Sequence, residues 1–84
     1  MYYVTMTDKF LSGWGKSEGK INKLVFECET YMEAEIVEKN ANNRDDMKYV
    51  NIVRKRPSYP SSTHFTQHKT KEDSSNWYRP NSFN

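Results

Sequence analysis

The segment that most constrains the fold is residues 23–46, KLVFECETYMEAEIVEKNANNRDD, in which a strand pattern leads directly into a helix pattern. Over residues 23–29, apolar side chains alternate with mostly acidic ones, which is typical of a strand in a sheet covered on one side only. Thr30 and Glu33 then match a capping box, the reciprocal pair of side chain to backbone hydrogen bonds that begins many helices. A strand followed at once by a capped helix predicts an α+β domain.

The helix is predicted over about residues 30–43 and is expected to pack on one face of a sheet. Tyr31, Ala34, Val37 and Ala41 recur at helical spacing and form an apolar stripe for that contact. The glutamates of this segment lie on the polar side of the helix. This position indicates a solvated face rather than paired carboxylates for acid–base chemistry.

The rest of the sheet is predicted from three further segments. Residues 2–7 are rich in β-branched and aromatic side chains, and residues 47–56 contain alternating valine and isoleucine positions. Residues 62–69 either form a fourth strand at the sheet edge or stay extended. We therefore expect a small antiparallel sheet of three or four strands, in the order β-β-α-β-(β), with one helix packed on one face.

Residues 10–22 contain all three glycines, Gly13, Gly15 and Gly19, and are expected to form a loop or an irregular hairpin connection. Their spacing does not match the phosphate-binding loop, which needs G-x-x-x-x-G-K-[ST]. Trp14 lies between two of these glycines. Its large apolar surface favours packing onto the sheet edge, and the alternative is display as a binding anchor.

The size and cysteine content of the chain limit its class. A chain of 84 residues is expected to form one domain. Cys28 has no second cysteine to pair with, so we expect a reducing compartment. Its apolar position in the strand pattern indicates an inert core thiol. No apolar run approaches the ~18 residues of a membrane span, and the N-terminus lacks the pattern of a signal peptide. We expect a cytoplasmic protein, in a bacterial or host cell, without a membrane partner.

Composition divides the chain into a predicted compact α+β body, residues 1–56, and a basic, aromatic C-terminal segment, residues 57–84. Residues 1–53 hold seven Lys/Arg and nine Asp/Glu, a net charge of −2, whereas residues 54–84 hold six and two, a net charge of +4. Every large apolar side chain of the C-terminal segment is aromatic. Its end, NWYRPNSFN, is expected to form an arm that either wraps the body or waits for a partner.

Two histidines are the first candidates for a metal site, and they do not support one. On a strand, His64 and His68 would lie on the same side about 13 Å apart, at ~3.3 Å per residue, which is too far to share an ion. A dyad of Cys28 with either histidine has no local sequence signature. We therefore expect no metal, no cofactor and no enzymatic activity.

The residues expected to make contacts are cations and aromatic rings. Cations attract phosphates, and rings stack on unpaired bases or fill pockets of a partner protein, so the mixture suits either kind of macromolecule. The isoelectric point of 8.7 lies below the value above ~9 that is usual for a general nucleic-acid binder. The expected contact residues are Trp14, Arg54, Lys55, Arg56, Tyr59, Trp77, Tyr78 and Arg79.

The stretches YYVTMTDKF, GWG, EGKINKLVFEC, EAEIVE, DMKYVNI and NWYRP together resemble a group of small uncharacterised proteins of phages and mobile elements of Gram-positive bacteria. The resemblance spans most of the chain, including Gly13-Trp14-Gly15 and Trp77-Tyr78-Arg79. It implies a genomic setting in which small proteins often act as counter-defence factors, including anti-CRISPR proteins, or as nucleic-acid-binding accessories. The resemblance carries over no site residues.

Three functions are expected from these observations. The first is inhibition of a bacterial defence effector, in the manner of an anti-CRISPR protein, by contact with a defence protein or nucleoprotein complex. The alternative is an accessory module that binds single-stranded RNA or DNA through the same residues. The third is a small structural or assembly protein that dimerises through an edge strand, so the chain is expected to be a monomer or a weak homodimer.

Overall fold

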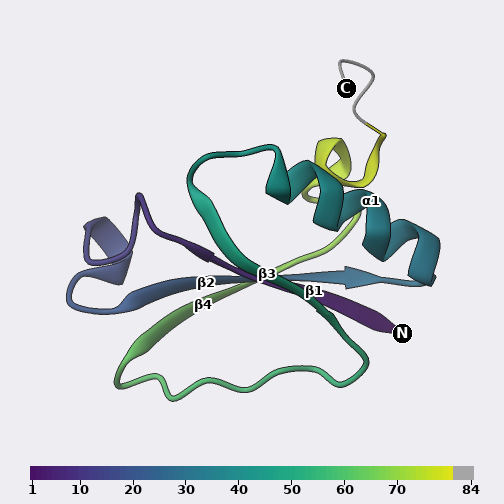
Figure 1. Ribbon diagram of the computed structural model, residues 1–84. Coiled ribbons are helices and arrows are strands. Elements are labelled where there is room, and N and C mark those ends of the chain that lie inside the picture. Colours follow the sequence, from purple (N-terminus) through teal and green to yellow (C-terminus); the bar gives the residue numbers. More distant parts are fainter. Residues whose placement is uncertain (81–84) are drawn as a thin grey trace.

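The computed structural model describes residues 1–80 and forms a four-stranded sheet with one α-helix packed on one face (Figure 1). The strands lie in the order β3-β1-β2-β4. This arrangement confirms the predicted α+β class and the order of elements along the chain. The elements are β1 (Tyr2–Asp8), the 3-10 turn η1 (Gly15–Ser17), β2 (Ile21–Cys28), α1 (Tyr31–Asn42), β3 (Met47–Val53), β4 (His64–Lys69) and the 3-10 turn η2 (Ser75–Tyr78).

The centre of the sheet is antiparallel, as the sequence predicted. Strand β1 pairs with β2 in a continuous register that runs from Tyr2 opposite Cys28 to Thr7 opposite Lys23. On its other side β1 pairs with β3, and here the register shifts between Thr5 and Thr7. Such a shift is a β-bulge. It bends the strand that holds the extra residue, here β3, and redirects its side chains.

Strand β4 departs from the prediction, because it runs parallel to β2 rather than antiparallel. The reason is the path of the chain. Strands β2 and β3 both run antiparallel to β1, so β3 ends near the end of the sheet where β2 also ends. Residues 54–63 then carry the chain from the β3 edge back across the sheet, and β4 begins beside the start of β2, with His64 opposite Ile21 (Figure 1).

The two faces of the sheet differ in what covers them. Leu24 and Phe26 of β2 face α1, so Lys23 and Glu27 face the opposite side. There the connection 54–63 approaches the sheet: Arg56 pairs with Glu27 at 3.3 Å. The connection 54–63 therefore crosses the face that α1 leaves open.

Helix α1 begins with the predicted Thr30 cap, whereas the reciprocal bond of Glu33 goes to the Glu29 amide rather than to the Thr30 amide of a capping box. The Thr30 hydroxyl accepts from the Glu33 amide at 3.1 Å, and the Glu33 carboxylate accepts from the Glu29 amide at 3.0 Å. No helix within residues 1–80 is long and apolar enough to cross a membrane. Between the helix and the sheet lies the core, which comprises Val4, Met6, Leu24, Phe26, Cys28, Ala34, Val37, Ala41, Met47 and Tyr78.

The C-terminal segment wraps the body as far as the structure describes it, and the alternative of a free arm is wrong for residues 75–80. Tyr78 is only 6% exposed, and the Trp77 ring packs on Phe26 with the ring centroids 4.7 Å apart. The Asn40 amide of α1 donates to the carbonyls of Trp77 and Arg79 at 2.9 and 2.7 Å. Residues 57–80 thus complete the fold of residues 1–56, and the last part of the predicted arm, residues 81–84, lies outside the described residues.

Candidate functional site

The loop between β1 and β2 is held by hydrogen bonds to its own backbone. Ser17, which is buried, donates its hydroxyl to the carbonyls of Leu11 and Trp14, the latter at 2.9 Å. At the start of the loop the Asp8 carboxylate accepts from the Leu11 amide at 3.1 Å. Each of these contacts fixes backbone inside the loop.

Further contacts tie the loop to the sheet. Ser12 donates its hydroxyl to the Asp8 carbonyl at 2.7 Å and accepts from the Asn22 amide of β2 at 3.0 Å. The Gly13 amide donates to the Lys20 carbonyl at 2.9 Å, and Gly13 has a φ of 86°, which a residue without a Cβ adopts readily. The loop is therefore a fixed platform rather than a loose connection.

This platform displays three large apolar side chains, Phe10, Leu11 and Trp14, which we call the apolar loop surface. Phe10 is 75% exposed and Trp14 is 72% exposed. The expectation that Trp14 would tuck onto the sheet edge is wrong, because the hydrogen bonds of Ser17 hold the backbone with the indole pointing outward. Beside it lies a hollow of ≈ 210 Å³ between the loop and β4, whose lining includes Leu11, Trp14 and Phe65.

The sequence-predicted contact residues do not gather on one surface. Arg54, Lys55 and Arg56 follow β3 and are exposed. Two of these cations already contact the body: the Arg54 guanidinium lies 5.2 Å from the centroid of the Tyr2 ring, and Arg56 pairs with Glu27. Two of the three side chains of the basic cluster therefore already have a contact within the chain.

The predicted aromatic contacts also have partners within the chain. Tyr59 is half-buried and stacks on the His64 ring at 5.2 Å. Trp77 and Tyr78 belong to the core and its border, so the expectation that they form a contact surface is corrected. Arg79 is exposed and lies beside them.

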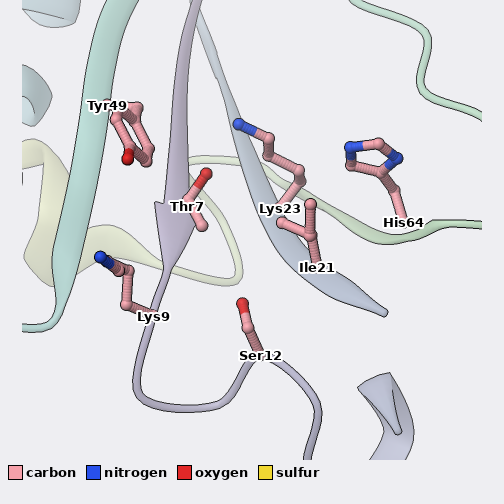
Figure 2. A pocket seen from close by; sticks show the side chains of 7 residues that line it. All are labelled: Thr7, Lys9, Ser12, Ile21, Lys23, Tyr49 and His64. Atoms are coloured by element: carbon pink, nitrogen blue, oxygen red, sulfur yellow. The ribbon is translucent and has the colours of Figure 1, made fainter. Parts of the chain in front are cut away.

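A second pocket, which the sequence interpretation did not identify, lies on the sheet face away from α1 (Figure 2). It has a volume of ≈ 330 Å³ and receives side chains from all four strands and from the loop after β1. We call it the sheet pocket. Its lining residues are Thr7, Lys9, Ser12, Ile21, Lys23, Tyr49 and His64.

Cys28 is a buried free thiol in the described part of the chain. Burial, reinforced by the negative charge of Glu33, raises the pKa of the Cys28 thiol from 9.0 to about 12, so the thiol stays protonated at neutral pH. Nucleophilic attack needs the thiolate. Within residues 1–80, no group of three or more His, Cys, Asp and Glu side chains could hold a metal ion.

Comparison with known proteins does not place the chain in a family. No protein-family model, no curated protein and no solved structure matches it.

Proposed function

We propose that this protein is a binding protein of a phage or mobile element that inhibits a bacterial defence effector by protein–protein contact through the apolar loop surface. The observation that carries the proposal is the exposure of Phe10, Leu11 and Trp14 on a loop held by the buried Ser17. The setting, a bacterial host and its defence proteins, rests on the resemblance described above.

The energetics of interfaces support this use of the loop. Tryptophan is enriched among the few residues that dominate binding energy, and such residues act by filling a pocket that excludes water. A loop that is already ordered loses less conformational entropy when it binds. Soluble monomers seldom gather large apolar side chains at the surface, because such patches promote aggregation. Without a partner to cover them, the exposed Phe10 and Trp14 would carry this risk.

The charge of the chain indicates which kind of inhibition to expect. Inhibitors that imitate nucleic acid present a strongly acidic surface, whereas this chain has a net charge of +2. We therefore propose that the protein occupies an apolar hot spot on a defence protein or nucleoprotein complex, rather than a nucleic-acid channel.

The experiment is affinity capture from lysates of bacteria that carry defence systems, combined with phage plating on the same strains. The tagged protein is compared with Trp14→Ala and with a matched control, Met32→Ala. Met32 is 73% exposed at the start of α1, away from the loop. We expect the wild type and Met32→Ala to retain a defence component and to raise plating efficiency, and Trp14→Ala to lose both.

Two outcomes would contradict the proposal. Capture of no defence component, together with unchanged plating, rules out the inhibitor function. Equal capture by Trp14→Ala and the wild type rules out the apolar loop surface as the contact. Light scattering during size-exclusion chromatography tests the third function, dimerisation through an edge strand. A dimer would have twice the mass of the monomer.

A further inference from the structure

The sheet pocket carries an inference that is independent of the apolar loop surface. Its lining combines an exposed ring, Tyr49, with two ammonium groups, Lys9 and Lys23, and it contains no Asp or Glu. Figure 2 shows Lys9 below Tyr49, and Lys23 on β2, separated from Tyr49 by Thr7 of β1. An aromatic face next to positive charge is the combination that binds an unpaired base together with its phosphate.

The position of Tyr49 is the most informative feature of the pocket. It is the one non-glycine residue of the described chain with a positive φ, 57°. The strand β3 bulges here, because Thr5 pairs with Asn51 while Thr7 pairs with Lys48. A side chain other than glycine costs about 1–3 kcal/mol in such a conformation, and strain of this kind is concentrated at binding and catalytic sites.

The bulge at Tyr49 places its ring in the sheet pocket. A bulge redirects a side chain out of the regular alternation of a strand. The Tyr49 ring is 69% exposed and lines the sheet pocket, rather than packing with the core. Glycine or asparagine would relax the backbone at this position, but neither supplies a ring, so the tyrosine points to a role outside the fold.

The cations of the pocket are not neutralised by a carboxylate in its lining. Burial lowers the pKa of Lys23, which is the effect expected for an ammonium group that has lost water. Its only cation–π partner in the described chain is the Tyr59 ring, 5.3 Å away. A bound phosphate would restore the charge stabilisation that Lys23 lacks.

We propose that the sheet pocket binds single-stranded nucleic acid, with one base stacked on Tyr49 and the adjoining phosphate between Lys9 and Lys23. The pocket runs across the sheet from Tyr49 on β3 to His64 on β4, three strand spacings or roughly 14 Å. This width suits a continuous single strand of nucleic acid better than one free nucleotide. Exposed rings on the face of a four-stranded sheet can serve in this way.

The test is fluorescence anisotropy with a labelled oligothymidylate of about eight nucleotides, a length within the ~4–16 nucleotides that small single-strand binding folds cover. Thymidine monophosphate and a DNA duplex are the comparison ligands. Binding is measured between about 50 and 200 mM salt, with the wild type and with Tyr49→Asn, Lys23→Gln, Tyr31→Asn and Lys39→Gln. The last two variants remove an exposed ring and an exposed cation from α1, and circular dichroism checks that each variant is folded.

We expect the wild type to bind the oligonucleotide at low salt, and Tyr49→Asn to bind at least about tenfold more weakly. Lys23→Gln should make the slope of log K against log salt concentration shallower by about 0.7, the contribution of one phosphate contact on a single strand. Tyr31→Asn and Lys39→Gln should change affinity less than about twofold.

Three results would overturn the inference: no binding at low salt, an unchanged affinity in Tyr49→Asn, or equal affinity for the duplex. If thymidine monophosphate binds as tightly as the oligonucleotide, the pocket is a mononucleotide site and not a site for single-stranded nucleic acid. None of the three residues of the apolar loop surface lines the sheet pocket. Failure here therefore leaves the proposed protein contact standing, and a failed capture experiment leaves the pocket standing.

Discussion

The phenol of Tyr78 donates a 2.7 Å hydrogen bond to the backbone carbonyl of Glu27, which lies 51 residues earlier in the chain. The Tyr78 ring packs edge-on against Phe26, with the ring centroids 6.1 Å apart at 62°. Turn η2 is thus fastened to β2 at the point where the strand leads into α1. This contact makes the C-terminal part of the described chain a component of the core.

Removal of that hydroxyl tests how strongly η2 contributes to stability. Tyr78→Phe keeps the ring but leaves the Glu27 carbonyl without this donor, and we expect the free energy of unfolding to fall by about 1–2 kcal/mol. The measurement is urea unfolding at neutral pH. Tyr31→Phe is the matched control, since its ring is exposed, and it should change stability by less than ~0.5 kcal/mol. Equal effects of the two variants would show that η2 does not support the core.

Stability should decline in alkaline solution because two acidic protons are held by the folded state. Burial raises the pKa of Tyr78 above its ordinary value of 10.0, and raises that of Cys28 from 9.0 to about 12. Between the unfolded and folded pKa values the folded chain binds the proton and the unfolded chain has lost it. The stabilisation is therefore complete below pH 9 and is lost as the pH rises, by at most ~1.4 kcal/mol per pH unit for each group.

Urea unfolding at pH values from 8 to about 11 measures this loss. Tyr78→Phe removes the tyrosine contribution, so its stability should fall less steeply than that of the wild type above pH 10. The same slope in both proteins would contradict the proposed burial of the phenol.

The Cys28 thiol should resist modification in the folded protein. Its pKa of about 12 leaves very little thiolate at pH 8, and the side chain is fully buried. A disulfide reagent such as dithionitrobenzoate should react slowly with the native protein and rapidly once urea has unfolded it. Rapid reaction of the native protein would show that Cys28 is accessible and would reopen the question of a reactive cysteine.

The parts of the fold that could be predicted from the sequence are those fixed by local signals. The strand pattern in residues 23–29 and the Thr30 cap of the helix each depend on neighbours within a few residues, and both the strand and the cap are present. The expectation that only one side of this strand is covered is wrong, because Val25 is fully buried on the other face. The direction of β4 depends instead on the route of residues 54–63 across the sheet, which no periodicity records. Antiparallel pairing was the natural expectation for a short connection, since parallel strands usually need a longer crossover.

The candidate sites were harder to predict because composition does not show which aromatic rings pack within the chain's own core and which stay exposed. Trp14 lies between two glycines and Trp77 between Asn76 and Tyr78, and neither setting has the periodicity of a strand or a helix, yet Trp77 packs on Phe26 while Trp14 is exposed. The difference lies in contacts made by distant residues. Tyr49 offered even less signal, because its bulge arises from the pairing of β1 with β3 and not from a glycine or asparagine at that position.

The strain at Tyr49 can be measured separately from any ligand. Tyr49→Gly should raise the free energy of unfolding by up to about 1.5 kcal/mol, because relief of roughly 1–2 kcal/mol of left-handed strain exceeds the entropy cost of glycine in a strand, roughly 0.5–1 kcal/mol. Lys48→Gly, one position earlier in β3, relieves no strain and should lower stability by about 0.5–1 kcal/mol. Thermal and urea unfolding of both variants decides between these signs. If both substitutions destabilise the protein equally, the backbone at Tyr49 is not strained, and the argument that its ring is kept there for binding loses its basis.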